Sequence, residues 1–226
     1  MGRRYIFQGV GATGAELTFV GAAAATTPPS ESTGQTSSTL VIPIPGGTED
    51  GDLLLAVTKT QVTPTPPAGW TEEFGGGGQV LHVWSRVRQA GDPSSYTWAV
   101  GADSSRSGGM AAFRGGVIGD SAIDSSGVGI PPCPDVTAGA EAGAIFVAFV
   151  GLETATETME AFGANPELSV EAQHISDGAS PYSSPYATAI GVVEGLGSNE
   201  TVGSDHQFTH SEELATSVVS IIIDPA

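Results

Sequence analysis

Residues 143–151 read Gly143-Ala-Ile-Phe-Val-Ala-Phe-Val-Gly151, and every position between the two flanking glycines is apolar. Successive side chains of a β-strand point to opposite faces of its sheet, so a run without polar alternation predicts a strand that is buried on both faces. Such a strand lies in the middle of a sheet, with other layers of protein above and below it. This run therefore indicates a chain built around packed β-sheets.

Residues 79–88 show the other pattern typical of a strand. Leu81 and Val83 fall on one face, whereas Trp84 and Arg86 fall on the other. This period of two predicts a strand with one buried and one half-solvated face. Similar short runs, rich in Val, Ile, Thr and aromatic residues, predict about ten strands, over residues 16–20, 39–44, 53–60, 79–88, 95–101, 108–114, 143–151, 167–174, 185–194 and 214–223.

Turn-forming residues separate these runs. The chain of 226 residues contains 32 glycines and 15 prolines, which lie between the apolar segments. Many short strands with Gly/Pro turns and no long amphipathic stretch predict an all-β fold, an antiparallel β-sandwich that is jelly-roll-like. The expected organisation is a short N-terminal arm over residues 1–14 and one β-sandwich domain over residues 15–226. No internal repeat with a fixed period is visible.

The charge composition excludes several classes of partner. Lys plus Arg is 7 against 25 for Asp plus Glu, which gives a formal net charge of -18. Phosphate backbones and anionic membranes attract cationic surfaces, so we expect neither nucleic-acid binding nor membrane docking. No apolar stretch approaches the roughly 20 residues of a membrane span, and no secretory signal is expected. Cys133 is the only cysteine, so neither an intrachain disulfide nor a Cys-based zinc site is expected.

Lysine is almost absent, since Lys59 is the only one in the chain. A protein with a net charge this far from zero repels itself at low ionic strength, and molar salt screens that repulsion. Two interpretations stay open at this point: adaptation to high salt, or an ordinary acidic protein.

The order of several motifs resembles a known family. The chain contains, in this order, Gly51-Asp-Leu53, Pro66-Pro-Ala-Gly-Trp70, Leu81-His-Val-Trp-Ser-Arg-Val-Arg-Gln-Ala-Gly-Asp-Pro93, Tyr96-Thr-Trp98 and Ala112-Phe-Arg-Gly-Gly116. This succession resembles a jelly-roll-like β-sandwich domain of tail and virion-surface proteins of tailed bacterial and archaeal viruses, over residues 15–225. Together with the scarcity of lysine, the resemblance points to a virus of a halophilic archaeon.

The resemblance implies a non-enzymatic structural protein of the virion, assembled in the host cytoplasm. The expected position is on the particle surface, as a capsid turret or decoration subunit or as a tail component. The expected partners are other virion proteins and further copies of the same chain, because virion positions are occupied by rings or trimers. The family carries no catalytic motif that could be transferred to this chain.

The motif residues also have structural interpretations of their own. Asp52 fits a turn before a strand, where its carboxylate can cap the backbone. Arg114 is expected to pair with a carboxylate. Trp70, Trp84 and Trp98 are large apolar anchors for a core between two sheets.

The first residues are a candidate docking arm. Arg3 and Arg4 stand beside Tyr5 and Phe7, just before a glycine-rich stretch at residues 9–14. A basic and aromatic arm on a flexible connection suits docking onto an acidic partner. The alternative is a first strand of the sandwich followed by a loop.

The rival function is host attachment through surface glycans. Sugar sites use exposed aromatic rings beside polar side chains. The strongest candidate platform is His82, Trp84 and Arg86 on one strand face, followed by Tyr182 and Tyr186 in a proline-flanked stretch.

Four motifs suggest chemistry only weakly. Asp205, His206 and His210 would suit a divalent metal, although histidine pairs in loops are usually solvated. Residues 48–52 could hold calcium or form an acidic turn. Gly119-Asp-Ser121 lacks the downstream Asp-x-x-His of an esterase, and the glycines of residues 9–14 lack the following helix of a dinucleotide site. We therefore expect no enzyme activity, no metal and no cofactor.

Overall fold

The computed structural model of the chain describes residues 16–26, 38–60, 62–75, 81–100, 106–126, 130–153, 163–164, 168–175, 186–209 and 215–226. Within these ranges the regular structure is strand, and the predicted all-β fold is confirmed. No helix in this part of the chain has the length and apolarity that a membrane span needs.

Two antiparallel sheets of five strands each form the sandwich. The first sheet contains, in spatial order, β1 (Thr18–Ala24), β7 (Arg106–Arg114), β3 (Leu53–Thr60), β5 (Leu81–Val87) and β4 (Thr71–Phe74). The second contains β12 (Ser169–Ile175), β13 (Tyr186–Leu196), β10 (Ala144–Glu153), β16 (Ala215–Pro225) and β8 (Gly116–Ser126).

Three short antiparallel pairs complete the described structure. They are β2 (Thr39–Pro43) with β6 (Ser95–Ala99), β9 (Val136–Thr137) with β14 (Thr201–Val202), and β11 (Gly163–Ala164) with β15 (Phe208–Thr209).

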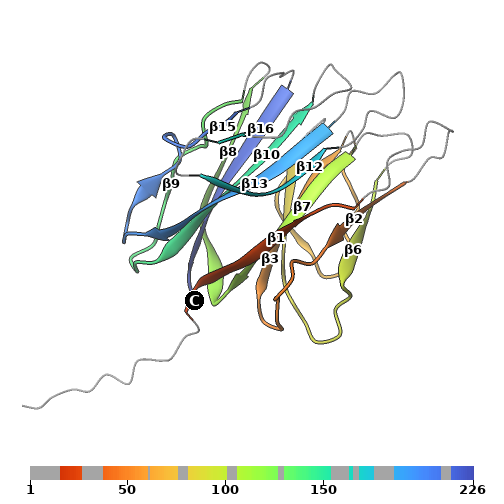
Figure 1. The fold of residues 1–226 in the computed structure, drawn as a ribbon, viewed down its shortest axis with the longest axis horizontal. Helices are drawn as coiled ribbons and strands as arrows, with labels where there is room; N and C mark the ends of the chain where they lie inside the picture. Colours follow the sequence, from red (N-terminus) through yellow and green to blue (C-terminus); the bar gives the residue numbers. More distant parts are fainter. Residues whose placement is uncertain are drawn as a thin grey trace, which may run out of the picture.

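The pairs cover the outer faces of the sheets, so the molecule has four layers (Figure 1). One apolar cluster lies between the sheets and combines residues of both, such as Leu55 and Phe149. A second cluster packs Leu40 and Trp98 of the β2–β6 pair against the first sheet. A third cluster packs β9, β14 and β15 against the outer face of the second sheet, around Phe146. Each main sheet is therefore buried on both faces.

Each sheet uses one half of the chain, and both halves connect their strands in the same order. In each sheet the first strand pairs with the last, the last with the second, the second with the fourth and the fourth with the third. The pairs β2–β6 and β9–β14 also correspond, because each joins the connection after the first strand to the connection before the last. In a jelly roll, by contrast, each sheet takes strands from both halves of the chain. The strand connections of this sandwich therefore differ from those of a jelly roll.

The strands agree closely with the sequence predictions. Each of the ten predicted segments overlaps a strand, and β10 pairs on both sides, with β13 and β16, as its apolar run predicted. One prediction about burial is wrong. The second face of β5 is not half-solvated, because His82 and Trp84 are 1% and 3% exposed. Trp84 belongs to the cluster between the first sheet and the β2–β6 pair, which covers this face.

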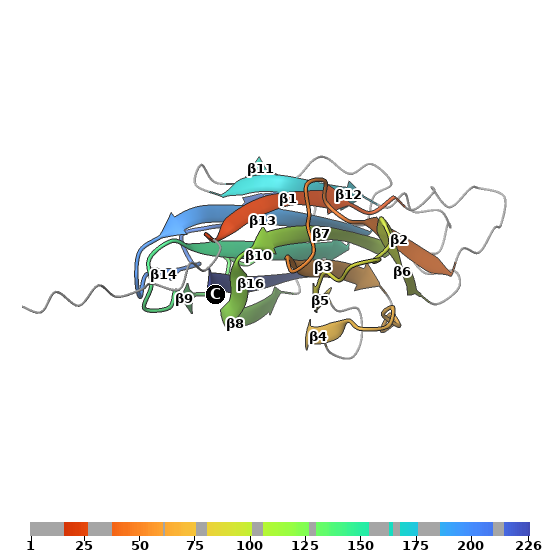
Figure 2. The same cartoon turned by 90° about the horizontal axis from the view of Figure 1, so that it is seen from below.

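The sheet edges differ in how they are covered (Figure 2). The edge strands β1 and β12 lie against each other across the sandwich. On the opposite side, β4 has only four residues and carries Glu72 and Glu73. The remaining edge strand, β8, has eleven residues and pairs with β16.

Candidate functional site

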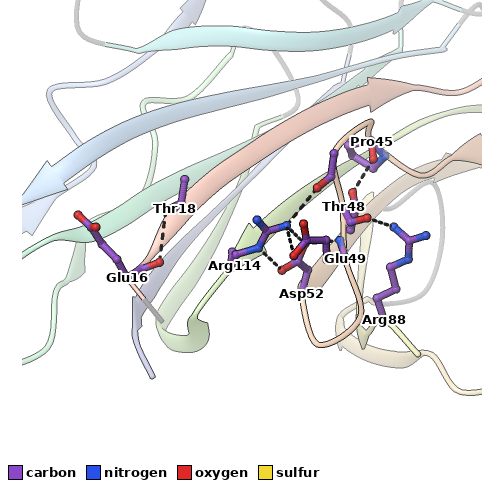
Figure 3. Close-up of polar contacts among 9 residues, drawn as sticks. Glu16, Thr18, Pro45, Thr48, Glu49, Asp52, Arg88 and Arg114 are labelled. Carbon is purple, nitrogen blue, oxygen red and sulfur yellow. Dashed lines mark hydrogen bonds and ion pairs between the residues drawn. The ribbon is translucent and has the colours of Figure 1, made fainter. Parts of the chain in front are cut away.

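The turn before β3 is tied to the end of β7 by an ion pair (Figure 3). Arg114 donates from Nε to Asp52 Oδ1 at 3.0 Å and from a terminal nitrogen to Asp52 Oδ2 at 3.1 Å. This two-pronged contact raises the pKa of Arg114. The predicted pairing of Arg114 with a carboxylate is therefore confirmed, and the partner lies 62 positions away in the chain.

Asp52 also caps its own turn, as predicted. Its Oδ2 accepts a hydrogen bond from the backbone N–H of Glu49 at 2.7 Å, while Glu49 itself lies 3.4 Å from Arg114. Thr48 is held in the same turn, since its hydroxyl donates to the Pro45 carbonyl and its own carbonyl accepts from Arg88. The acidic stretch of residues 48–52 thus forms a turn whose buried carboxylate faces an arginine, which favours the turn interpretation over a calcium loop.

A second ion pair fixes the turn after β5. Arg86 donates to Asp92 Oδ1 at 2.6 Å and Oδ2 at 3.2 Å, and hydrogen bonds from Arg86 lower the pKa of Asp92 to about 2. Arg86 also donates to the Ala68 carbonyl at 2.9 Å. Gly69 adopts a φ of 85°, and a Cβ there would lie 1.9 Å from a guanidinium nitrogen of Arg86. A glycine is therefore required in the Pro-Pro-Ala-Gly-Trp motif.

The aromatic residues of the motifs meet under the β2–β6 pair. The ring centroid of Trp70 lies 5.1 Å from those of Tyr96 and Trp98, and all three residues are buried. The expectation that Trp70, Trp84 and Trp98 are buried is confirmed. Their place is the outer face of the first sheet and not the space between the two sheets.

These contacts join the motifs that carry the sequence resemblance. Asp52 contacts Arg114, Trp70 contacts Trp98, and Gly69 lies against Arg86. The motif residues therefore contact one another and hold the strands and turns of the first half of the chain together. Their role in the structure is to stabilise the fold.

The candidate glycan-binding rings that the structure describes, those of His82, Trp84 and Tyr186, are buried. Trp84 donates from its indole N–H to Thr58 Oγ1 at 3.1 Å and stacks on His82 at 5.8 Å. His82 Nδ1 lies 2.6 Å from Glu72 Oε1. Arg86 shares this strand face, as predicted, but is engaged with Asp92. A glycan could stack on His82 and Trp84 only if the layer that covers these two rings moved away.

Tyr186 is likewise buried, with Lys59 Nζ 5.5 Å from its ring centroid. Lys59, the chain's only lysine, is 1% exposed. Beside them, Ser107 and Thr188 join β7 to β13 through their hydroxyls at 2.9 Å. Tyr182 lies outside the described residues.

The weak chemical motifs can be placed only in part. His206 is buried beside Phe146, with ring centroids 5.4 Å apart, while Asp205 is exposed and His210 lies outside the described residues. No cluster of three or more His, Cys, Asp or Glu suited to a metal occurs in the described ranges. Ser121 lies within β8 opposite Ile221, in a strand rather than at a strand-to-helix turn. The glycines of residues 9–14 and the candidate arm of Arg3, Arg4, Tyr5 and Phe7 lie outside the described residues.

Charge is divided unequally between the two halves. All seven Lys and Arg residues occur at or before Arg114, whereas sixteen of the 25 Asp and Glu residues follow it. The half that forms the second sheet therefore contains no cationic residue of either type. Its edge strand β8 carries Asp120 and Asp124, together with Val117 and Ile123, which are 49% and 42% exposed.

This acidic edge is the feature that the sequence predictions missed. Residues 116–126 contain two glycines, two aspartates and three serines, a composition that resembles a loop more than a strand. The available signal was the set of apolar residues Val117, Ile118, Ala122 and Ile123. Comparisons with protein-family models, curated proteins and solved structures found no match for the chain.

Proposed function

We propose that this chain is a structural protein of a tailed virus and stands on the particle surface as a capsid turret or decoration subunit, or as a tail component. It acts by associating with further copies of itself and with other virion proteins. The sequence motifs that resemble virion-surface domains support this proposal.

The observation that carries the proposal is the spatial convergence of those motifs. The contacts of Asp52 with Arg114, of Gly69 with Arg86 and of Trp70 with Trp98 each join motifs that are separate in the sequence. A resemblance resting on residues that jointly stabilise a fold is stronger than one resting on scattered matches. It supports a shared scaffold, while the virion role comes from the family that the motifs resemble.

The proposal is tested on purified particles. Quantitative mass spectrometry should find the chain at a fixed copy number per particle, and an antibody against the folded chain should label intact virions. Its absence from particles that band at a single density would refute a structural role. A glycan array in high salt checks host attachment, which predicts a specific signal; the proposed structural role predicts none.

A further inference from the structure

The turn between β13 and β14 contains a short motif that the proposed function does not use. Residues 199–201 read Asn199-Glu-Thr201, an asparagine followed two positions later by a threonine, with a residue other than proline between them. This spacing is the acceptor motif for attachment of a sugar to an asparagine side chain. The other asparagine of the chain, Asn165, is followed by proline and does not match the motif.

The motif lies at the surface of the molecule. Asn199, Glu200 and Thr201 are all exposed. Strand β14 and its partner β9 lie on the outer face of the second sheet, at one end of the molecule (Figure 2). An enzyme can therefore reach the Asn199 side chain from solvent without separating the layers of the fold.

The conformation of this turn does not depend on contacts of the Asn199 side chain. The backbone N–H of Asn199 donates to the Gly139 carbonyl at 2.8 Å, and that of Glu200 donates to the Gly197 carbonyl at 3.3 Å. The Glu200 carboxylate in turn accepts a hydrogen bond from the Gly197 N–H. Within the described ranges, the side-chain amide of Asn199 makes no hydrogen bond. A sugar attached to its Nδ2 would therefore displace no hydrogen bond of the fold.

Both key residues of the motif also have structural interpretations. Asn199 has a φ of 54°, a conformation that asparagine and aspartate adopt more readily than other residues with a side chain. The Thr201 hydroxyl lies 3.0 Å from the Thr137 hydroxyl in β9. Neither interpretation requires the motif itself, because aspartate suits the same φ and valine has nearly the shape of threonine. Substitutions can therefore remove the motif and keep the turn.

We propose that Asn199 is a site of N-linked glycosylation. The substrate is a sugar activated at its anomeric carbon by a phosphate or diphosphate ester, and a glycosyltransferase of the producing cell transfers it. The Asn199 Nδ2 attacks the anomeric carbon, so that a C–N bond forms and the C–O bond to the phosphate breaks. The phosphate leaves with the bonding electron pair, and a base of the transferase takes one proton from Nδ2. This modification goes beyond the proposed function and does not depend on it.

Mass spectrometry of the full-length chain, isolated from cells that naturally produce it, tests the site. No Lys or Arg follows Arg114, so trypsin would leave Asn199 in one long fragment, and a protease that cuts after glutamate is used instead. The mass of peptide 195–200 should exceed its calculated mass by a whole number of sugar residues, and fragmentation should place the addition on Asn199. An unmodified peptide, or an addition on Ser198, would refute the proposal.

Matched variants produced in the same cells separate the motif from the fold. Thr201→Val should abolish the addition although Asn199 remains, whereas Thr201→Ser should keep it. Thr137→Val removes the same hydroxyl contact from the β9 side and leaves the motif intact, so the addition should persist. Asn199→Asp should lose the addition and keep the turn. An equal loss in Thr137→Val and Thr201→Val would contradict recognition of the motif.

The cell fraction that modifies the chain identifies the activated sugar. Full-length chain that carries no sugar is incubated with membranes, which hold lipid-linked sugars, or with the soluble fraction and nucleotide-linked sugars. Modification of Asn199 by either fraction supports the site and shows which donor it takes. If neither fraction modifies the chain, whether folded or unfolded in urea, the proposal fails. The proposed place of the chain in a virus particle is tested separately, by its copy number.

Discussion

Arg86 and Asp92 lie six positions apart and hold the turn between β5 and β6. Their side chains are 15% and 9% exposed, so the pair is mostly shielded from solvent. Asp92 also accepts a hydrogen bond from the backbone N–H of Gln89 at 2.8 Å. The same arginine lies 5.5 Å from the centroid of the Tyr96 ring, which joins the turn to the aromatic cluster below β2 and β6.

Replacement of this carboxylate should make stability depend less on acid pH. The pKa of Asp92 is lowered from 3.8 to about 2 in the folded chain. A lowered pKa stabilises the fold above pH 3.8, and that contribution disappears as the pH falls toward about 2. Asp92→Asn should therefore lower the free energy of unfolding by about 1–2 kcal/mol at pH 7 and by little near pH 2. Urea unfolding across this range measures the difference.

The exposed Asp50 supplies the control for that experiment. Asp50→Asn should change the unfolding free energy by less than about 0.5 kcal/mol at every pH. A loss in Asp92→Asn that stayed constant down to pH 2 would show that the carboxylate charge is not its cause.

The contacts of a single residue were predictable where the composition of the chain leaves few kinds of partner. Arg114 stands among many carboxylates and few cations, so its pairing could be expected, although Asp52 as its partner could not. The burial of Trp84 could be expected from the size of its apolar side chain, whereas the alternation of β5 is also compatible with a solvated face. Its cover comes from Leu40 and Trp98, which are distant in the chain. Local periodicity therefore indicates faces but does not show what packs on them.

At the scale of elements, β7 depends on two adjacent glycines in its middle. A Cβ at Gly108 would lie 2.7 Å from the Val57 carbonyl oxygen and 3.0 Å from the side chains of Leu40 and Ile42. A Cβ at Gly109, on the other face, would lie 3.1 Å from the side chain of Ile190 in the opposite sheet. The missing side chains let β7 approach the layers on both of its faces.

Gly108→Ala should therefore destabilise the fold by about 1–3 kcal/mol, because the backbone oxygen of Val57 cannot move away cheaply. The matched control is Gly46→Ala, where nothing lies within 4 Å of the added Cβ. That variant should remain within about 0.5 kcal/mol of wild type. Denaturant melts of both proteins measure the effect, and equal stability of the two would argue against close packing at β7.

The elements that were predicted from the sequence share a strong apolar pattern, as in β3 and β10. Strand β8 was missed because its middle follows no strict alternation. The register with β16 shifts between Ile221 and Ile223, which marks a bulge near Gly119 and Asp120. An edge strand also packs less of its surface than a central one, so its sequence tolerates polar residues that elsewhere indicate loops.

At the scale of the whole molecule, the two halves repeat one connectivity without repeating a sequence. The strand order in both sheets is the same, yet β10 begins 28 positions after β8 whereas β3 begins 35 positions after β1. Unequal connections remove any fixed period, which is why no repeat is visible in the sequence. The halves also diverge in charge, since every Lys and Arg belongs to the first.

Because of that asymmetry, we expect the stability of the whole molecule to depend on salt. The Debye length falls from about 10 Å at 0.1 M salt to about 3 Å at 1 M, so repulsion among the carboxylates of the second half fades over this range. The melting temperature should rise by about 5 °C between 0.1 M and 1 M KCl, as expected for a gain of roughly 2 kcal/mol in a domain of this size. Scanning calorimetry measures this rise.

A triple variant provides the control for the salt prediction. Its changes Glu141→Gln, Glu171→Gln and Glu194→Gln are all at exposed positions of the second half, so it should have a higher melting temperature at low salt and gain less from added salt. If the melting temperature of the wild type did not change with salt, adaptation to high salt would be excluded. The repulsion that arises from the net charge of -18 would then not destabilise the fold measurably at low salt.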